Sequence, residues 1–215
     1  MVLPDPSEVG ARGPGRGLPL WLVYPIFFLS GFAAILYQIV WQRALFTIYG
    51  TSVESVTIVV TAFMLGLGFG SLAGGAVSRA EGRPLVAIFG LMELGIGGFG
   101  LVSMALFRWV GSFTSGAAGL GIGAAALAVV VFPTLLMGGT LPILVAHAVR
   151  RSRNVGRSVG GLYFVNTLGS AAGAIAGAAL VLAALGQAGS VRLAASVNLF
   201  VGLAALALPR RREGR

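Results

Sequence analysis

Five polar residues interrupt the apolar runs of this chain, and their side chains could hold a cation or a proton. They are Glu93, Thr140, Tyr163, Asn166 and Asn198. A carboxylate surrounded by amide and hydroxyl oxygens offers acceptors to a positively charged ligand. The same groups can instead bind one another, so that Glu93, protonated or hydrogen-bonded to Asn166 and Thr140, locks the helices together. Both hypotheses stay open, because a ligand with several positive charges would need a second Glu93, which a homodimer could supply.

The residues for several other kinds of site are missing. The chain has no Cys, which excludes disulfides, thiolate metal sites and cysteine nucleophiles. All 15 basic residues are Arg, which excludes a Schiff-base lysine. His147 is the single His, whereas metal sites use three or four ligands, so we predict no metal and no cofactor. The sequence also predicts no catalytic residues, and an enzyme within the membrane is the weakest hypothesis.

The elements that carry the polar residues belong in lipid. Hydrophobic residues make up 57% of the chain and charged residues only 10%, and the mean hydropathy is +0.94. A soluble domain has about a quarter of its residues charged. We therefore predict an all-α polytopic membrane bundle of six transmembrane helices, the fourth kinked or divided by Pro133 and Pro142. The predicted spans are residues 20–43, 55–78, 84–107, 117–148, 158–184 and 189–208.

The arginines predict how these spans are oriented. One set of loops contains only Arg43, Arg108 and Arg192. The opposite loops and tails contain Arg12, Arg16, Arg79, Arg83, Arg150, Arg151, Arg153, Arg157, Arg210, Arg211, Arg212 and Arg215. Because cytoplasmic loops carry the excess of basic residues, we predict a bacterial inner-membrane protein with both termini in the cytoplasm. The net charge of +9 is then mainly a topology signal, and we predict no nucleic-acid binding.

The sequence predicts one membrane domain between two short tails. Residues 1–18 are rich in Pro and Gly and lack apolar periodicity, so we expect a disordered cytoplasmic tail. Residues 19–208 are predicted to form the transmembrane domain, in contact with the lipid bilayer. Residues 209–215 are predicted to form a basic cytoplasmic tail. We expect no soluble domain.

The helical rise places most of the polar residues at a similar depth. Glu93 and Thr140 lie roughly 13 Å from the cytoplasmic ends of their spans at 1.5 Å per residue. On the same scale Asn166 lies at roughly 12 Å and Asn198 at roughly 15 Å. Tyr163 is about one turn nearer the cytoplasm. Four spans therefore contribute polar side chains to one predicted layer.

A second polar group lies toward the outer end of the first span. It consists of Gln38, Gln42, Arg43 and, from the second span, Glu54. Arg43 can snorkel to the periplasmic interface and pair with Glu54. Trp41 and Tyr49 would join the aromatic belt there. Gln38 lies deeper and is expected to bond across helices, so the group is either an outer anchor or the mouth of a substrate path.

Glycines that recur four residues apart predict close helix packing. The chain has 34 Gly; Gly66 and Gly70 share one helix face, and Gly169, Gly173 and Gly177 share another. In lipid, such faces allow two backbones to approach closely. A phosphate-binding loop would need a preceding strand, whereas these glycines lie within apolar spans. The pattern leaves open whether the faces pack within one chain or between two.

Five segments together resemble a known family. They are "FFLSGFAAILYQIVWQR" (27–43), "FMLGLGFGS" (63–71), "LMELGIG" (91–97), "PTLLMGGTLPIL" (133–144) and "GRSVGGLYFVNTLGSAAGAIAG" (156–177). The chain resembles the six-helix membrane domain of bacterial fused membrane and spermidine-synthase-like proteins, which is itself similar to half of a major facilitator transporter. One departure is Ser78, which stands where major facilitators have an Asp that helps to hold a gate closed. This substitution argues against transporter-like alternating access.

The resemblance implies a link to polyamine chemistry without assigning catalysis to this chain. Members of the family usually continue into a cytoplasmic aminopropyltransferase-like domain that carries the catalytic carboxylates, and this sequence has no such segment. We therefore expect a non-enzymatic inner-membrane subunit or anchor that docks a separate cytoplasmic enzyme or joins a larger membrane complex. The alternative is a transporter or channel for a small cation, such as a polyamine, that uses Glu93.

Overall fold

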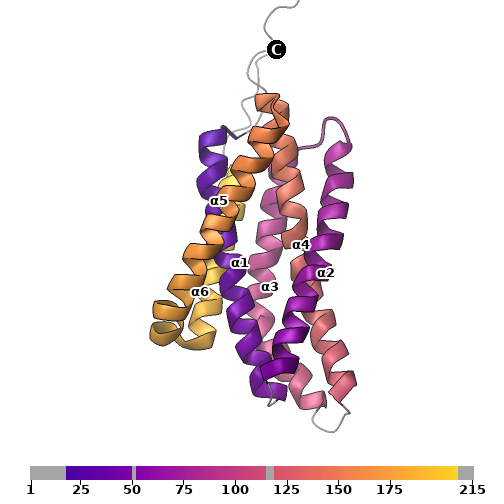
Figure 1. Cartoon of the computed structure of the whole chain (residues 1–215), viewed down its shortest axis with the longest axis vertical. Helices are drawn as coiled ribbons and strands as arrows, with labels where there is room; N and C mark the ends of the chain where they lie inside the picture. Colours follow the sequence, from indigo (N-terminus) through magenta and orange to yellow (C-terminus); the bar gives the residue numbers. More distant parts are fainter. Residues whose placement is uncertain (1–17, 50–51, 115–118, 208–215) are drawn as a thin grey trace, which may run out of the picture.

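The computed structural model describes residues 18–49, 52–114 and 119–207, and nearly all of them are helical (Figure 1). The elements are α1 (Leu20–Tyr49), α2 (Ser52–Arg79), α3 (Leu85–Thr114), α4 (Gly119–Ser152), α5 (Val155–Ala176), the π-helical segment η2 (Gly177–Val181) and α6 (Leu182–Ala207). These residues contain no strand, so the all-α prediction is confirmed for them. Apart from residue 18, the predicted tails lie outside the described residues.

Five continuous helical segments of the described chain are long and apolar enough to cross a membrane. They are Leu20–Thr47, Val56–Arg79, Leu85–Ser112, Gly123–Ser152 and Val155–Ala207. The last one contains α5, η2 and α6, and Gly186 leaves the helical conformation within it, with φ 63° and ψ −175°. Glycine adopts this positive φ readily because it has no Cβ. Figure 1 shows α5 and α6 running in opposite directions. The segments are those of a multi-pass membrane protein, and the count of six crossings stays a prediction.

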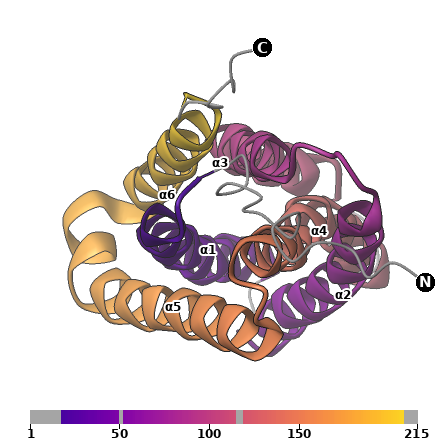
Figure 2. The ribbon, with the colours of Figure 1, turned by 90° about the horizontal axis from the view of Figure 1, so that it is seen from above.

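Helix α1 lies at the centre of the bundle. It packs mainly against α5 and α6 and also contacts α2, α3 and α4 (Figure 2). Around it, α2 pairs with α4, and α3 packs against both α4 and α6. The Leu36 and Val40 side chains of α1 are fully buried, whereas Leu72 of α2 and Ile175 of α5 are each 72% exposed. Large exposed apolar side chains are expected where lipid replaces water as the solvent.

Trp41 lies inside the bundle, which corrects the prediction that it joins an interfacial aromatic belt. Its side chain is fully buried. Its Nε1 donates to Ser103 Oγ of α3 at 3.1 Å, and its ring stacks on Tyr37 with the centroids 4.9 Å apart. The indole N–H therefore has a protein partner and does not need the membrane interface to supply one. The side chain of Tyr49 lies outside the described part of the structure.

Helix α4 continues through Pro133 and Pro142, so the prolines do not divide the fourth span, and the kink that was the other predicted outcome stays a prediction. A proline inside a helix removes one main-chain hydrogen bond. Thr134, next to the first proline, places Oγ1 3.0 Å from the Val130 carbonyl oxygen and 3.1 Å from the Ala62 carbonyl oxygen of α2. Hydroxyl groups and neighbouring helices of this kind allow a helix in lipid to tolerate proline.

Helices α2 and α4 touch through glycines. A Cβ at Gly66 would collide with Thr134, and a Cβ at Gly70 would collide with the carbonyl group of Leu135. Both glycines are buried. The obstacle at Gly70 is main chain, which cannot rotate away as a side chain can. Small residues permit this close approach between helices in lipid.

Helix α5 and the η2 segment after it pack against α1 through Gly169 and Gly173 of α5 and Gly177 of η2. A Cβ at Gly169 would collide with the carbonyl group of Phe28, and one at Gly173 would lie 2.6 Å from the Phe32 carbonyl oxygen. A Cβ at Gly177 would lie 2.7 Å from a leucine side chain of α1. Both sets of glycines therefore face other helices of the same chain.

The α2–α3 and α4–α5 connections lie at the same end of the bundle (Figure 1). Arg150 joins them, because its Nη2 donates to the Ser78 carbonyl oxygen at 2.7 Å. At the turn into α5, Arg153 has a φ of 53°. Asn154 then caps α5, accepting a hydrogen bond from the Arg157 backbone N–H at 2.9 Å. The arginine-rich connections are thus tied to each other and to the helix ends.

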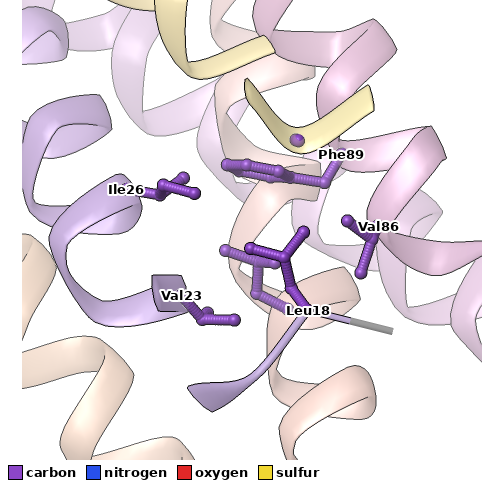
Figure 3. Close-up of a pocket in the computed structure, with 7 residues that line it drawn as sticks. Leu18, Val23, Ile26, Val86 and Phe89 are labelled. Carbon is purple, nitrogen blue, oxygen red and sulfur yellow. The ribbon is translucent and has the colours of Figure 1, made fainter. Parts of the chain in front are cut away.

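A small apolar void of about 10 Å³ lies near the start of α1. Figure 3 shows Leu18, Val23, Ile26, Val86 and Phe89 around it. His147 Nε2 donates to the Leu18 carbonyl oxygen at 2.9 Å and holds the segment before α1 against the bundle. The void is about the size of one water molecule and offers it no polar partner, so it does not suit a polar ligand.

Candidate functional site

Eight polar side chains line a cavity of about 340 Å³. The cavity lies among α1, α2, α4, α5 and α6, and its polar residues are Ser30, Gln38, Ser71, Thr140, Tyr163, Asn166, Ser170 and Asn198. The rest of the wall is mainly apolar and includes Phe27, Phe63, Met137 and Leu141. Four of the five residues of the predicted polar site, Thr140, Tyr163, Asn166 and Asn198, therefore line this cavity. Tyr163 is the most exposed of these four, at 62%.

Glu93 of α3 lies behind the wall of this cavity. Its side chain is 0% exposed. Ser30 Oγ donates to Glu93 Oε1 at 2.6 Å, and Asn198 Nδ2 donates to Oε2. Both partners line the cavity. The carboxylate is therefore one side chain away from the cavity, and its hydrogen bonds connect α3 to α1 and α6.

Thr140 and Asn166 bond elsewhere, which corrects the partners predicted for Glu93. Thr140 Oγ1 donates to the Met137 carbonyl oxygen of its own helix at 2.7 Å. A hydroxyl group on a helix commonly bonds back to a carbonyl of the preceding turn. Asn166 Nδ2 donates to the Phe27 carbonyl oxygen at 3.2 Å, because α5 packs on α1 and not on α3.

Three serines of the cavity, Ser30, Ser71 and Ser170, were not predicted from the sequence. Ser30 lies roughly 15 Å into α1 at 1.5 Å per residue. This depth is close to the values of roughly 13 Å for Glu93 and roughly 15 Å for Asn198 that the sequence predicts. Ser170 lies one turn after Asn166, and its Oγ is 3.1 Å from the Gly31 carbonyl oxygen and 3.1 Å from the Asn166 carbonyl oxygen. Applying the depth rule to hydroxyl groups as well as to amides and acids would have found Ser30.

The residues of the predicted outer group occupy different environments. Gln38 lines the cavity. Gln42 is half-buried and Arg43 is exposed. The side chain of Glu54 lies outside the described residues, so its pairing with Arg43 stays a prediction. Gln38 therefore belongs with the cavity in the described structure, whatever the role of the other three residues.

Comparison with known proteins gives one relative with a named activity. Polyamine aminopropyltransferase 2 of Streptomyces coelicolor is 28% identical to this chain over 206 residues. The match covers 94% of this chain and 36% of the relative, so the chain spans about a third of the relative's length. No protein-family profile matches the chain. No solved structure matches it either. The apolar helices thus show a distant similarity to part of a spermidine-synthase-like protein.

Proposed function

We propose that this chain is a non-enzymatic membrane anchor that holds an aminopropyltransferase-like enzyme at the cytoplasmic face of a bacterial inner membrane. The observation that carries the proposal is the alignment of 94% of this chain with 36% of a polyamine aminopropyltransferase. The aligned residues here are helices long and apolar enough to cross a membrane. In this proposal the matched residues form the membrane part, and aminopropyl transfer belongs to residues outside the match.

Six crossings with both termini in the cytoplasm fit the lengths of the helices. Helix α5 has 22 residues and α6 has 26. At 1.5 Å per residue α5 is roughly 33 Å long and the part of α6 after Gly186, residues 187–207, is roughly 32 Å long, and each is long enough for a hydrocarbon core of about 30 Å. The non-helical conformation of Gly186 divides the two. The arginine-rich connections then lie on the cytoplasmic side, as the positive-inside rule requires.

The docking surface in this proposal is the arginine face, which we define as the exposed residues Arg79, Arg83, Arg153 and Arg157. These side chains extend from the α2–α3 and α4–α5 connections at one end of the bundle. A basic surface of this kind favours the approach of an enzyme with an acidic surface. The Arg150 bond to the end of α2 keeps the two connections together.

Purification from the native membrane in mild detergent, without crosslinking, tests the anchor function. We expect a stoichiometric co-purifying protein with aminopropyl transfer activity. Substituting both Arg153→Gln and Arg157→Gln should reduce its recovery. The matched control, Arg108→Gln with Arg192→Gln, removes the same charge from the opposite end and should leave recovery unchanged. A monodisperse chain with no such partner, at normal expression, would contradict the proposal.

A second candidate function, passage of a small cation such as a polyamine, is favoured by the cavity beside Glu93. The cavity volume of about 340 Å³ and the buried carboxylate behind its wall are the supporting observations. Proteoliposomes containing the purified chain should then take up labelled spermidine, and Glu93→Gln should abolish uptake. Uptake no faster than in protein-free liposomes would exclude this function and leave the anchor function intact.

A further inference from the structure

We propose that the 340 Å³ cavity is a binding site for a primary alkylammonium ion, with the ammonium group at Asn198 and the alkyl chain along the apolar wall. This inference deepens the second candidate function, since passage of an amine requires such a site. Binding does not require passage, so a non-transporting anchor can also contain the site.

The first observation is an unpaired acceptor. Asn198 is 2% exposed and lines the cavity. Its Nδ2 donates to Glu93, whereas its Oδ1 has no hydrogen-bond partner within the described part of the chain. An unpaired buried carbonyl oxygen destabilises the folded state, and a ligand with an N–H group would remove that penalty.

The second observation is that three other polar groups of the cavity also present acceptors. Ser30 donates its proton to Glu93 at 2.6 Å, and Thr140 donates its proton to the Met137 carbonyl oxygen at 2.7 Å. A hydroxyl group has one proton and two lone pairs, so both residues retain acceptor capacity after these bonds. One N–H of the Asn166 amide likewise donates to the Phe27 carbonyl oxygen of α1 at 3.2 Å. A site with these properties selects a hydrogen-bond donor.

The third observation is that the nearest ionisable side chain is an acid. The Glu93 carboxylate is buried, and its two partners, Ser30 and Asn198, are uncharged. No residue that lines the cavity is charged. In a medium of low dielectric constant, a carboxylate attracts a cation across an intervening side chain far more strongly than it would in water. A donor that is also a cation therefore fits better than a neutral alcohol or amide.

The shape and the walls of the cavity favour an organic cation over a metal ion. A volume of about 340 Å³ exceeds the needs of a bare ion. Phe27, Phe63, Leu67 and Met137 supply apolar surface from three helices. An alkyl chain would bury its methylene groups against these side chains. One carboxylate matches one ammonium group, so a monoamine is the simplest ligand.

Calorimetric titration of the full chain in detergent with n-pentylammonium tests this site. The neutral comparison is 1-pentanol, and the anionic comparison is pentanoate. We expect pentylammonium to bind about 10- to 100-fold more tightly than 1-pentanol, as for hydrogen bonds that involve charged groups. Pentanoate should not bind. Equal affinity for the amine and the alcohol, or no saturable binding of the amine, would overturn the proposal.

Two variants locate the site. Glu93→Gln should weaken pentylammonium binding about 10- to 100-fold and change 1-pentanol binding much less, because the variant loses the negative charge while the side chain keeps its shape. Thr140→Val, which is isosteric and leaves the hydrogen bonds of Glu93 in place, should weaken amine binding about three- to tenfold. Its matched control is Thr134→Val on the same helix, because Thr134 does not line the cavity.

A thermal unfolding curve accompanies each variant. If Glu93→Gln fails to fold, the comparison of Thr140→Val with Thr134→Val decides the question. A folded Glu93→Gln protein with unchanged amine affinity, or equal affinities for the two threonine variants, refutes the site. These binding measurements are independent of enzyme co-purification and of liposome uptake, so failure here is distinguishable from failure of either proposed function.

Discussion

Replacing Gly70 by Ala should separate α2 from α4. The new Cβ would collide with the Leu135 carbonyl group and would lie 3.1 Å from the Gly138 Cα. Both obstacles are main chain, so relief requires the helices to move apart along their shared face. Overpacking of a close-packed interior costs about 1–3 kcal/mol. We expect a loss of about 2 kcal/mol, which corresponds to a roughly 30-fold smaller ratio of folded to unfolded protein.

Gly68→Ala is the matched control on the same helix. Gly68 is exposed, and a Cβ there would meet nothing within 4 Å. Ala is favoured over Gly in a helix by up to about 1 kcal/mol. The control should therefore be neutral or slightly stabilising, and the two variants should differ by about 2–3 kcal/mol.

Reversible unfolding by SDS in mixed micelles, followed by far-UV circular dichroism, measures this difference. A Gly139→Ala variant adds a graded case, because its Cβ would meet the flexible end of the Met92 side chain. It should be less destabilised than Gly70→Ala, since a side-chain rotation relieves the contact. If Gly70→Ala is as stable as Gly68→Ala, then the α2–α4 contact through Gly70 is wrong, together with the cavity wall that α2 and α4 share.

Three further variants test other parts of the bundle by the same unfolding assay. Ser103→Ala removes the acceptor of the Trp41 Nε1 proton and leaves a buried N–H unpaired, so it should cost about 1–3 kcal/mol; a neutral result would mean that Trp41 is not buried there. Asn154→Ala removes the cap of α5 and should cost about 1 kcal/mol. Gly173→Leu should displace α5 from α1 and unfold the protein at lower SDS than Gly160→Leu, since a Cβ at Gly160 meets nothing; equal midpoints would contradict the α1–α5 contact.

The length of the apolar runs and the spacing of the glycines were informative, because a lipid environment imposes both on a helical bundle. Runs such as residues 84–107 can only be accommodated in lipid as helices, and the corresponding α3 is helical over Leu85–Thr114. Gly66 and Gly70 recur at the interval that places residues on one helix face. The spacing could not tell which helix lies opposite, because it describes one surface and not its partner. That choice depends on side chains far away in sequence, such as Thr134.

The position of a residue along its helix could be estimated from the sequence, whereas its direction around the helix axis could not. The rise per residue places Glu93, Thr140 and Asn166 at comparable depths. Yet the partners of Glu93 are Ser30 and Asn198. Each helix can rotate about its axis, and all six are apolar on most sides, so no stripe of polar residues fixes that rotation. A pattern that is hydrophobic all round carries little information about which face is buried.

The central position of α1 has a consequence for biosynthesis. Its Ser30 and Trp41 hydrogen-bond to residues that lie 63 and 62 positions later in the chain, and Ser170, which bonds to Gly31, follows 139 positions later. Helix α1 therefore leaves the ribosome before α3 and α5 and enters the bilayer with polar groups whose partners have not yet been translated, and lipid tails cannot substitute for them. Nascent chains halted before α3 should consequently stay bound to the insertion machinery, whereas chains that extend past α6 should be released into the bilayer.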